Sequence, residues 1–535
     1  MADAEVQNPA SSRSGPAEWD SVDCYNSSDA LAGGGVLNGA NGYSLRSLSD
    51  IKTQKAQREY KHNIHGLDVT VEVKPEVRCC GCRASSTGVK RAKFATPVLL
   101  VIVMLLLMLL LYDVPSFESR GPLHLHLLDD PQSAAMDAVC LDGSPGAIYI
   151  TPAVAGFESS WQFYLEGGGW CWGAENCVAR GTTSLGSSIG YPATINEIGT
   201  GLVSSDCGAN PTFCKFNQVF FKYCDGNSFS GRREGPLQVQ TADGTQKEVW
   251  FRGSAVIDAA LRVLHTQYGF DEATEVLLAG GSAGGLAVFL QANRIGDFLR
   301  ANSQSVRYKV VPVSGFFIEH DNVNGESVYQ DQMRSLFEMS GAIDGLSPSC
   351  IAAQNPGEEW KCNFAGPAYA HVNAPVFVIN SALDAWQVAC ILTALPMVGT
   401  GGSSSDVEFH GHCNAMEAWM RCADLDGSAI TRCSVAQMQT LIDFQEEFVN
   451  QLTSSVTFSM PQNSAFIYSC HTHSGMISQP QMWSALEVAG VAVTDAVSRW
   501  WFAPGGAGVL PPSLPCMRSA TEGGGSCNPT CPLDS

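Results

Sequence analysis

The sequence predicts an α/β fold, in which a mostly parallel central sheet is flanked by helices and a single transmembrane helix precedes the sheet. Short apolar runs of strand length alternate with longer runs whose apolar residues recur at helical spacing. The clearest pair is TEVLLAG at 274–280 followed by GLAVFLQANRIGDFLR at 285–300, and another helical run at 254–269 ends at Gly269. Ligands of such sheets bind at the carboxyl ends of the strands, so we expect the functional site there.

An uninterrupted apolar run, PVLLVIVMLLLMLLLY at 97–112, predicts the transmembrane helix. Ala95 and Thr96 extend it to residues 95–112, close to the roughly 17–25 residues that a spanning helix needs. A buried core helix is the alternative, although so long a run of Val, Ile, Leu and Met is unusual there. The run lies too deep in the chain for a cleaved signal peptide, which favours a signal anchor.

Charges on the two sides of this run predict its orientation. Basic residues precede it and acidic residues follow it (Lys90, Arg91 and Lys93; Asp113 and Glu118), and the basic side of an anchor stays in the cytosol. We therefore expect segment 1–94 to be cytosolic and largely disordered. Residues 113–134 are expected to form a luminal linker. Residues 135–535 are expected to form a folded domain in the Golgi or secretory pathway, or at the cell surface.

Charge and cysteine content narrow the class of protein. The net charge is −21, and residues 1–95 hold 12 Lys and Arg against 11 Asp and Glu, so the rest of the chain carries −22. Such an acidic region argues against nucleic acid or another polyanion as a partner. Of the 20 cysteines, 16 follow the anchor. A large, even number there is typical of disulfides formed in an oxidising compartment, although their pairing cannot be read from the sequence.

Ser282 lies in the run GGSAG at 280–284, between a strand-like run and a helical run. This is the G-x-S-x-G pattern of a nucleophile on a tight strand-to-helix turn, where small neighbours are needed because the serine side chain is exposed on a strained backbone. The alternative is a small residue at a close packing contact. The flanking strand and helix favour a nucleophile.

Such a turn predicts an acid after a later strand and a histidine near the end of the domain. Asp384 follows the strand-like run APVFVIN and is the expected acid, with capping of the next helix as its alternative role. His471 and His473 end the run AFIYSCHTHSG, and their spacing alone does not separate them. His410 and His412 form a His-x-His pair, but no acidic or histidine partner at familiar spacing completes a metal site, so no metal is expected.

Ester cleavage by a serine also needs backbone N–H groups that hold the developing oxyanion. Ala283, directly after the serine, is expected to supply one. Gly168 and Gly169, in the run FYLEGGGWCW, are expected to supply another because glycine lets the backbone approach the reacting carbonyl closely. The alternative for this run is a tight turn in which Trp170 fills a gap in the core.

Ten stretches, taken in chain order, resemble the pectin acetylesterase family, which includes the animal lipid deacylase Notum. They cover about residues 138–532 and are CLDGSPGAIYI, FYLEGGGWCW, LGSS, NPTFCKFNQVFFKYCDGNSFSG, FRG, GGSAGG, INSALDAWQ, CSVAQMQTLIDFQEEF, SCHTHSG and CNPTC. The resemblance implies an α/β-hydrolase-like fold and a serine carboxylesterase without metal or other cofactor, with residues 135–535 as its catalytic domain. It implies these roles: nucleophile Ser282, orienting acid Asp384, base His473, and oxyanion positions Gly168, Gly169 and Ala283.

Two positions depart from the family pattern. Gly281 stands where the family usually has a cysteine just before the nucleophile, and Ser474 stands where many plant members have a cysteine after the histidine. Neither departure removes a predicted catalytic group. A disulfide or packing detail near the site is therefore expected to differ.

The predicted function is hydrolysis of O-acetyl esters on a polysaccharide or glycan through an acyl-enzyme intermediate. The DAWQ run at 384–387 is similar to the polysaccharide-esterase branch of the family. One alternative is a Notum-like deacylase that removes a fatty acyl group from a protein. Another is a non-catalytic binding protein that kept the fold.

Overall fold

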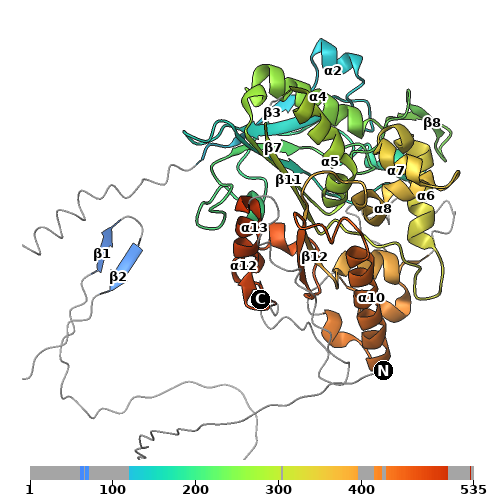
Figure 1. Cartoon of the computed structure of the whole chain (residues 1–535). Coiled ribbons are helices and arrows are strands. Elements are labelled where there is room, and N and C mark those ends of the chain that lie inside the picture. The colour runs from blue at the N-terminus through green and yellow to red at the C-terminus, as the bar shows by residue number, and fades with distance from the viewer. Residues whose placement is uncertain are drawn as a thin grey trace, which may run out of the picture. The chain divides into compact units, whose positions relative to one another are not determined.

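The computed structural model describes residues 61–64, 67–70, 120–302, 305–395, 415–424, 429–503 and 531 (Figure 1). The chain divides into two units, residues 1–112 and 113–535. In the first unit, the described residues form a hairpin of β1 (Lys61–Ile64) and β2 (Leu67–Thr70). The predicted anchor at 95–112 lies outside the described residues, as does most of segment 1–94. Within the described part, no helix is both long and apolar enough to cross a membrane.

A nine-stranded sheet forms the centre of the second unit, as far as the structure describes it. Its strands are β3 (Leu123–Leu127), β4 (Ala147–Thr151), β5 (Ser160–Leu165), β6 (Thr194–Ile195), β7 (Asn217–Phe221), β10 (Glu275–Gly281), β11 (Arg307–Val313), β12 (Phe377–Ser381) and β13 (Ser464–Tyr468). The order is β13-β12-β11-β10-β5-β7-β4-β3-β6. The strands from β13 to β7 are parallel, whereas β4, β3 and β6 continue with antiparallel pairing. The predicted mostly parallel sheet is thus confirmed.

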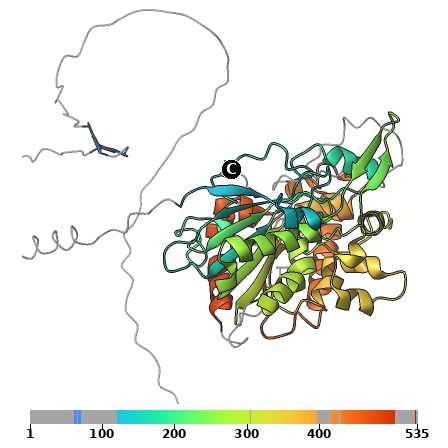
Figure 2. The same cartoon turned by 90° about the horizontal axis from the view of Figure 1, so that it is seen from above.

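Helices cover both faces of this sheet, which explains why its strands are apolar nearly throughout. Successive side chains of a strand point to opposite faces. Along β10, Val276 and Leu278 join the core that also contains α4 (Gly253–Gln267) and α5 (Ala283–Asn302), whereas Leu277 and Ala279 join the core of α12 (Pro480–Ala485) and α13 (Val493–Phe502). Figure 2 shows α4 and α5 side by side over one face of the sheet.

Further elements surround the sheet. The helices α6, α8 and α10 pack on the same core as α4 and α5. The remaining elements described in this unit, besides short 3-10 and π turns, are α2 (Pro131–Ala135), α3 (Ala174–Arg180), α6 (Val328–Ser340), α7 (Pro348–Ala353), α8 (Ala365–Tyr369), α9 (Ala385–Gln387), α10 (Val435–Thr453), α11 (Gly475–Ser478) and the hairpins β8 (Leu237–Gln240) with β9 (Gln246–Val249) and β14 (Glu487–Val488) with β15 (Val491–Ala492).

The linker predicted over residues 113–134 extends too far. Residues 123–127 within it form β3, which pairs with β4 in the central sheet, and α2 begins at Pro131. The sequence LHLHL alternates leucine with histidine, so one face of the strand is apolar although its mean hydropathy is modest. Leu123 is buried in the core, and Leu125 packs against the same core. The folded region therefore starts before residue 135.

Disulfides support the predicted oxidising environment. The described residues form the pairs Cys140–Cys224, Cys171–Cys177, Cys207–Cys214, Cys350–Cys362, Cys422–Cys433 and Cys470–Cys531. Cys390 is also disulfide-bonded. Such a set is typical of secreted or luminal domains.

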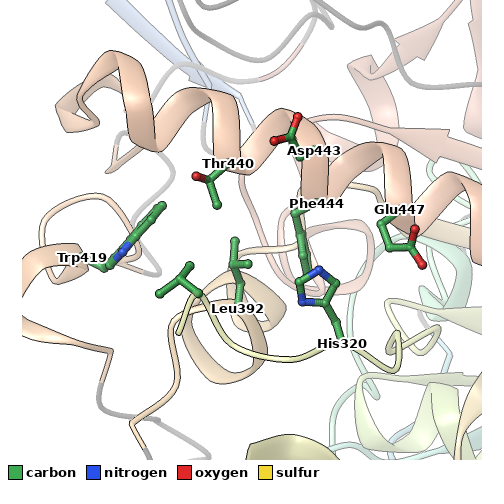
Figure 3. A pocket seen from close by; sticks show the side chains of 8 residues that line it. His320, Leu392, Trp419, Thr440, Asp443, Phe444 and Glu447 are labelled. Carbon is green, nitrogen blue, oxygen red and sulfur yellow. The ribbon is translucent and has the colours of Figure 1, made fainter. Parts of the chain in front are cut away.

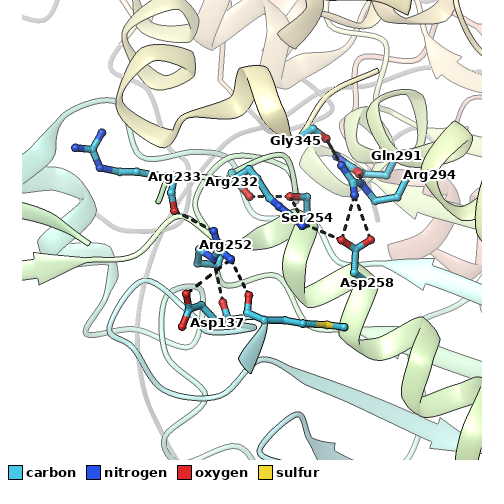
Figure 4. Close-up of polar contacts among 11 residues, drawn as sticks. Asp137, Arg232, Arg233, Arg252, Ser254, Asp258, Gln291, Arg294 and Gly345 are labelled. Carbon is cyan, nitrogen blue, oxygen red and sulfur yellow. Dashed lines mark hydrogen bonds and ion pairs between the residues drawn. The ribbon is translucent and has the colours of Figure 1, made fainter. Parts of the chain in front are cut away.

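A polar network, which we call the Asp258 network, joins α4 to α5 (Figure 4). Asp258 of α4 accepts hydrogen bonds from Arg232 Nη1 at 2.6 Å and from Arg294 Nη1 of α5 at 3.1 and 3.2 Å. Arg294 also donates to the carbonyl of Gly345. Nearby, Arg252 donates to three backbone carbonyls at 2.7–3.2 Å (Met136, Asp137 and Arg233). The bonds from Arg294 tie α5 to α4 and to the backbone at Gly345.

Candidate functional site

Ser282 forms the turn between β10 and α5. Its φ is 57°, in the left-handed region that non-glycine residues rarely adopt. A Cβ on Gly280 would lie 2.2 Å from the Gly284 carbonyl oxygen, and a Cβ on Gly284 would lie 2.0 Å from the carbonyl oxygen of Leu165. Only glycine fits at these two positions, so the small neighbours predicted for a tight nucleophile turn have a steric cause.

The glycine directly before the serine has a different cause. A Cβ on Gly281 would lie 2.2 Å from Ile477 Cδ1 and 2.4 Å from the hydroxyl of Tyr164. These two side chains occupy the space that a cysteine at this position would need. At Gly281, Ile477 and Tyr164 thus fill the space where the family pattern has a cysteine side chain.

His473 lies between Ser282 and Asp384. His473 Nε2 is 2.8 Å from Ser282 Oγ, and His473 Nδ1 is 3.0 and 2.9 Å from the two carboxylate oxygens of Asp384. A neutral imidazole with its proton on Nδ1 satisfies both contacts, because Nε2 can then accept the serine hydroxyl. The structure thus brings together the three side chains that the sequence predicted, in the order that general-base activation of a serine requires.

Asp384 is held by the strand ends. It follows β12, is fully buried, and caps α9 by accepting the Gln387 N–H at 3.0 Å. Its backbone pairs with Thr472, the residue before His473 in the loop after β13. The cap and the contact with His473 are therefore made by the same carboxylate, so the cap does not exclude the predicted role as the acid.

The other histidines considered lie elsewhere. His471 is buried, and its Nε2 lies 2.9 Å from the backbone carbonyl of Asp424. His410 and His412 fall outside the described residues. Among the residues that are described, no group of three or more His, Cys, Asp or Glu side chains is arranged to hold a metal ion.

The glycine-rich loop after β5 approaches Ser282 closely. A Cβ on Gly167 would lie 2.3 Å from the Gly281 carbonyl oxygen and 2.9 Å from Ser282 Cβ. The Gly168 carbonyl accepts a hydrogen bond from Arg180 Nη2 at 2.9 Å, and the Gly169 carbonyl accepts one from the Tyr223 hydroxyl at 2.8 Å. In a trans peptide the N–H points away from the carbonyl before it. The bond from Arg180 therefore directs the Gly169 N–H away from that guanidinium.

The N–H groups of the predicted oxyanion donors have no acceptor among the residues that the structure describes. The backbone N–H groups of Gly168 and Gly169 donate no hydrogen bond to other described residues, and neither does that of Ala283. Ala283 is the first residue of α5, where helix geometry leaves the N–H without an intrahelical acceptor. These donors remain available to a bound group, and their oxyanion role stays a prediction.

Arg180 is a residue that the sequence did not single out. Its side chain is 3% exposed, and burial lowers its pKa from the usual value, although the hydroxyl of Tyr223 and the carboxylates of Asp225 and Glu166 act in the opposite direction. The guanidinium lies 5.1 Å from the Tyr223 ring centroid and donates from Nε to the Leu185 carbonyl at 3.1 Å. A last-turn helix arginine is ordinarily a surface residue, so nothing in the sequence indicated this role.

Aromatic side chains line the other side of His473. The ring centroids of Phe317 and Trp386 lie 6.1 and 6.2 Å from that of His473. Both rings also contact Trp170, at 5.0 and 5.3 Å. All three aromatic side chains are buried. The predicted alternative role of Trp170, which was to fill a gap in the core, is thus compatible with a neighbouring loop that serves the site.

A cavity of about 440 Å³ lies at a different place, between α10 and the loop after β11 (Figure 3). His320 lies on its lower side in this view, with its ring 5.1 Å from that of Phe444. Ser282, His473 and Asp384 are not among its lining residues, which are His320, Val323, Leu392, Trp419, Thr440, Asp443, Phe444 and Glu447.

The geometry is that of an α/β protein with a serine, a histidine and an aspartate gathered at the carboxyl ends of parallel strands. The chain belongs to the pectinacetylesterase family, whose model matches residues 117–531. Pectin acetylesterase 11 of Arabidopsis thaliana is 28% identical over 404 residues, which cover 75% of this chain and 90% of that protein. Pectin acetylesterase 7 of the same plant is 29% identical, with coverage of 75% and 91%.

A second group of relatives carries another name. The palmitoleoyl-protein carboxylesterase Notum of Mus musculus is 30% identical over 290 residues, which cover 52% of this chain and 53% of that protein. The family predicted from the sequence is therefore confirmed. The similarity extends further along the plant proteins than along Notum.

Proposed function

We propose that this protein is a serine carboxylesterase that removes O-acetyl groups from a polysaccharide or glycan. The observation that carries the proposal is the chain of contacts from Ser282 Oγ through His473 to the buried Asp384 carboxylate, with distances of 2.8–3.0 Å. The plant relatives named pectin acetylesterase support ester hydrolysis and an acetylated polysaccharide as substrate class.

In the proposed reaction, His473 takes the Ser282 proton while the serine oxygen attacks the ester carbonyl. Asp384 stabilises the imidazolium that forms and keeps the ring in place. The oxyanion is held by the N–H groups of Gly168, Gly169 and Ala283. His473 then protonates the leaving sugar oxygen, and a water that it activates releases acetate from the acyl-enzyme.

Replacing the nucleophile tests the proposal. Ser282→Ala should lower kcat for acetate release by at least about 10⁴-fold, because the acyl-enzyme cannot form. The measurement is acetate release from a panel of acetylated polysaccharides and from p-nitrophenyl acetate, with labelling of the wild type by a fluorophosphonate probe. Wild-type rates in folded Ser282→Ala protein, or a wild type that the probe does not label at Ser282, would overturn the mechanism and favour a binding protein.

A protein deacylase is the second function that the relatives support. Notum is named for a palmitoleoyl-protein substrate, and a fatty acyl chain would need a deep apolar pocket beside Ser282. A preference for p-nitrophenyl esters of eight or more carbons would favour this function over the acetylesterase.

We also propose that the anchor at 95–112 holds this catalytic unit on the luminal or extracellular side. The support is the apolar run, its basic N-terminal flank and the disulfides of the second unit. Protease added outside intact microsomes should trim about the first 90 residues of the chain and spare the disulfide-bonded unit. Protection of the N-terminal segment would reverse the orientation.

A further inference from the structure

Three aromatic rings close the buried side of the candidate site. The ring centroids of Trp170, Phe317 and Trp386 lie 5.0–5.3 Å from one another, in edge-to-face contact. We call this group the ring triangle. Its members are 5%, 1% and 7% exposed, and two of them contact the His473 ring.

The ring triangle is built from the same segments as the site. Trp170 directly follows Gly169 of the glycine-rich loop, Phe317 lies in the loop that leaves β11, and Trp386 lies two residues after Asp384. These segments therefore place Phe317 and Trp386 beside the His473 ring and Trp170 against both of them.

Hydrogen bonds hold the triangle rigidly. Gln387 accepts the N–H of Ile318 at 3.0 Å and donates to the carbonyl of Phe316 at 3.1 Å, so it grips the backbone on both sides of Phe317. The Trp170 indole N–H donates to the Ser228 hydroxyl at 2.7 Å. Behind the triangle, Tyr329 continues the packing, with its ring 6.1 Å from that of Trp170. The rings are thus fixed in place before any substrate binds.

The saccharide part and the acyl part of an ester substrate differ in how well they can pack against the ring triangle. A saccharide is bulky and polar, so in the proposed complex it lies toward solvent. The acyl group must then face the triangle, and each methylene beyond acetyl would need volume that the three rings fill. Interiors are close-packed, and inserting further methylenes is costly.

We propose that the ring triangle restricts the acyl group to acetyl or one close to it in length, with Trp386 as the residue that sets this limit. The proposal rests on Ser282 being the nucleophile, as argued above. Trp386 is the most exposed of the three rings and contacts His473, so its removal opens space beside the His473 ring.

The test compares hydrolysis of p-nitrophenyl acetate, butyrate and octanoate by the wild type and by Trp386→Ala. The wild type should lose at least about tenfold in kcat/KM from acetate to octanoate, and Trp386→Ala should raise the octanoate-to-acetate ratio at least about tenfold, since one methylene alone can be worth 10–200-fold in a fitted pocket. Trp386→Leu should give an intermediate ratio and serves if the alanine variant does not fold.

Trp419→Ala is the matched control, because Trp419 is 8% exposed and lines the separate cavity of Figure 3. It should keep the wild-type ratio. A wild-type ratio in a Trp386 variant that the fluorophosphonate probe labels overturns the proposal but leaves the esterase intact. A wild type that prefers octanoate overturns the acyl limit and favours the deacylase. A wild type that is neither labelled nor active on any ester overturns both proposals.

Discussion

The Asp258 network and the Ser282 site use similar polar groups in opposite ways. In the Asp258 network, one carboxylate is shared by Arg232 and Arg294, and the guanidinium of Arg252 is taken up by backbone carbonyls (Figure 4). At the site, a single carboxylate faces a single imidazole, which faces a single hydroxyl. The arginine donors of the Asp258 network bond groups within the protein, whereas the contacts at the site end in the Ser282 hydroxyl, which a ligand can reach.

The difference separates a structural network from a reactive one. Buried polar groups are normally saturated because an unpaired one costs free energy. At the site, the N–H groups of Gly168, Gly169 and Ala283 donate to no other described residue, and the backbone of Ser282 is in the left-handed region. Clusters of open N–H groups and strained backbone are typical of functional sites. The same substitution made in both regions should therefore have opposite consequences.

The largest expected effect is the loss of the carboxylate at the site. Asp384→Asn should lower kcat by about 10⁴-fold, because an amide cannot stabilise the imidazolium and favours the wrong tautomer. Its oxygen can still cap α9, so the fold should persist. The measurement is hydrolysis of p-nitrophenyl acetate alongside chemical unfolding. A fall of less than tenfold would contradict the role of Asp384.

A smaller effect on kcat is expected for substitution of Arg180. Its guanidinium is buried and paired, as in a structural network, but it also bonds the glycine-rich loop of the site. Arg180→Lys can donate to the Gly168 carbonyl or to the Leu185 carbonyl, but its single ammonium does not reproduce the planar fork that serves both. Misplacement of the loop should lower kcat by about 100-fold with little change in KM.

The readout for Arg180→Lys is kcat per fluorophosphonate-titrated site. A purely structural arginine would reduce the number of titrated sites and leave kcat per site unchanged, and that outcome would remove Arg180 from the positioning role.

The smallest effect on catalysis is expected in the Asp258 network. Asp258→Asn leaves two arginines without a carboxylate and should lower the free energy of unfolding by about 1–3 kcal/mol. Because the site's contacts do not involve Asp258, kcat should stay within a factor of about two of wild type. Denaturant unfolding and acetate release measure the two quantities. A large loss of kcat with an unchanged free energy of unfolding would contradict the purely structural role of the Asp258 network.

Local sequence patterns predicted the parts of this molecule that local sterics decide. The turn at Ser282 was visible because glycines at 280 and 284 are required by backbone contacts within and beside the turn. The alternation in LHLHL also carried the signal of β3, but the predicted linker at 113–134 covered it. A strict count of period-two residues would have found the strand.

Features that depend on distant segments could not be predicted in this way. Sequence spacing did not distinguish His471 from His473 as the base. In the fold, His473 contacts Ser282 Oγ, whereas His471 contacts the backbone carbonyl of Asp424. The space beside Gly281 is filled by Ile477, which is far away in the sequence. The disulfide between Cys470 and Cys531 likewise joins distant positions, so no local pattern indicates it. The family resemblance supplied the choice of histidine that the residues alone left open.

The histidine loop follows β13, which is the last strand of the central sheet in chain order and lies at its edge. A growing chain therefore exposes Ser282 and Asp384 well before the residue that would activate the serine has been synthesised. Under the proposed mechanism, the polypeptide has no esterase activity during translocation. It acquires this activity only when β13 pairs with β12. Truncated products of the same message would be inert toward the esters they encounter.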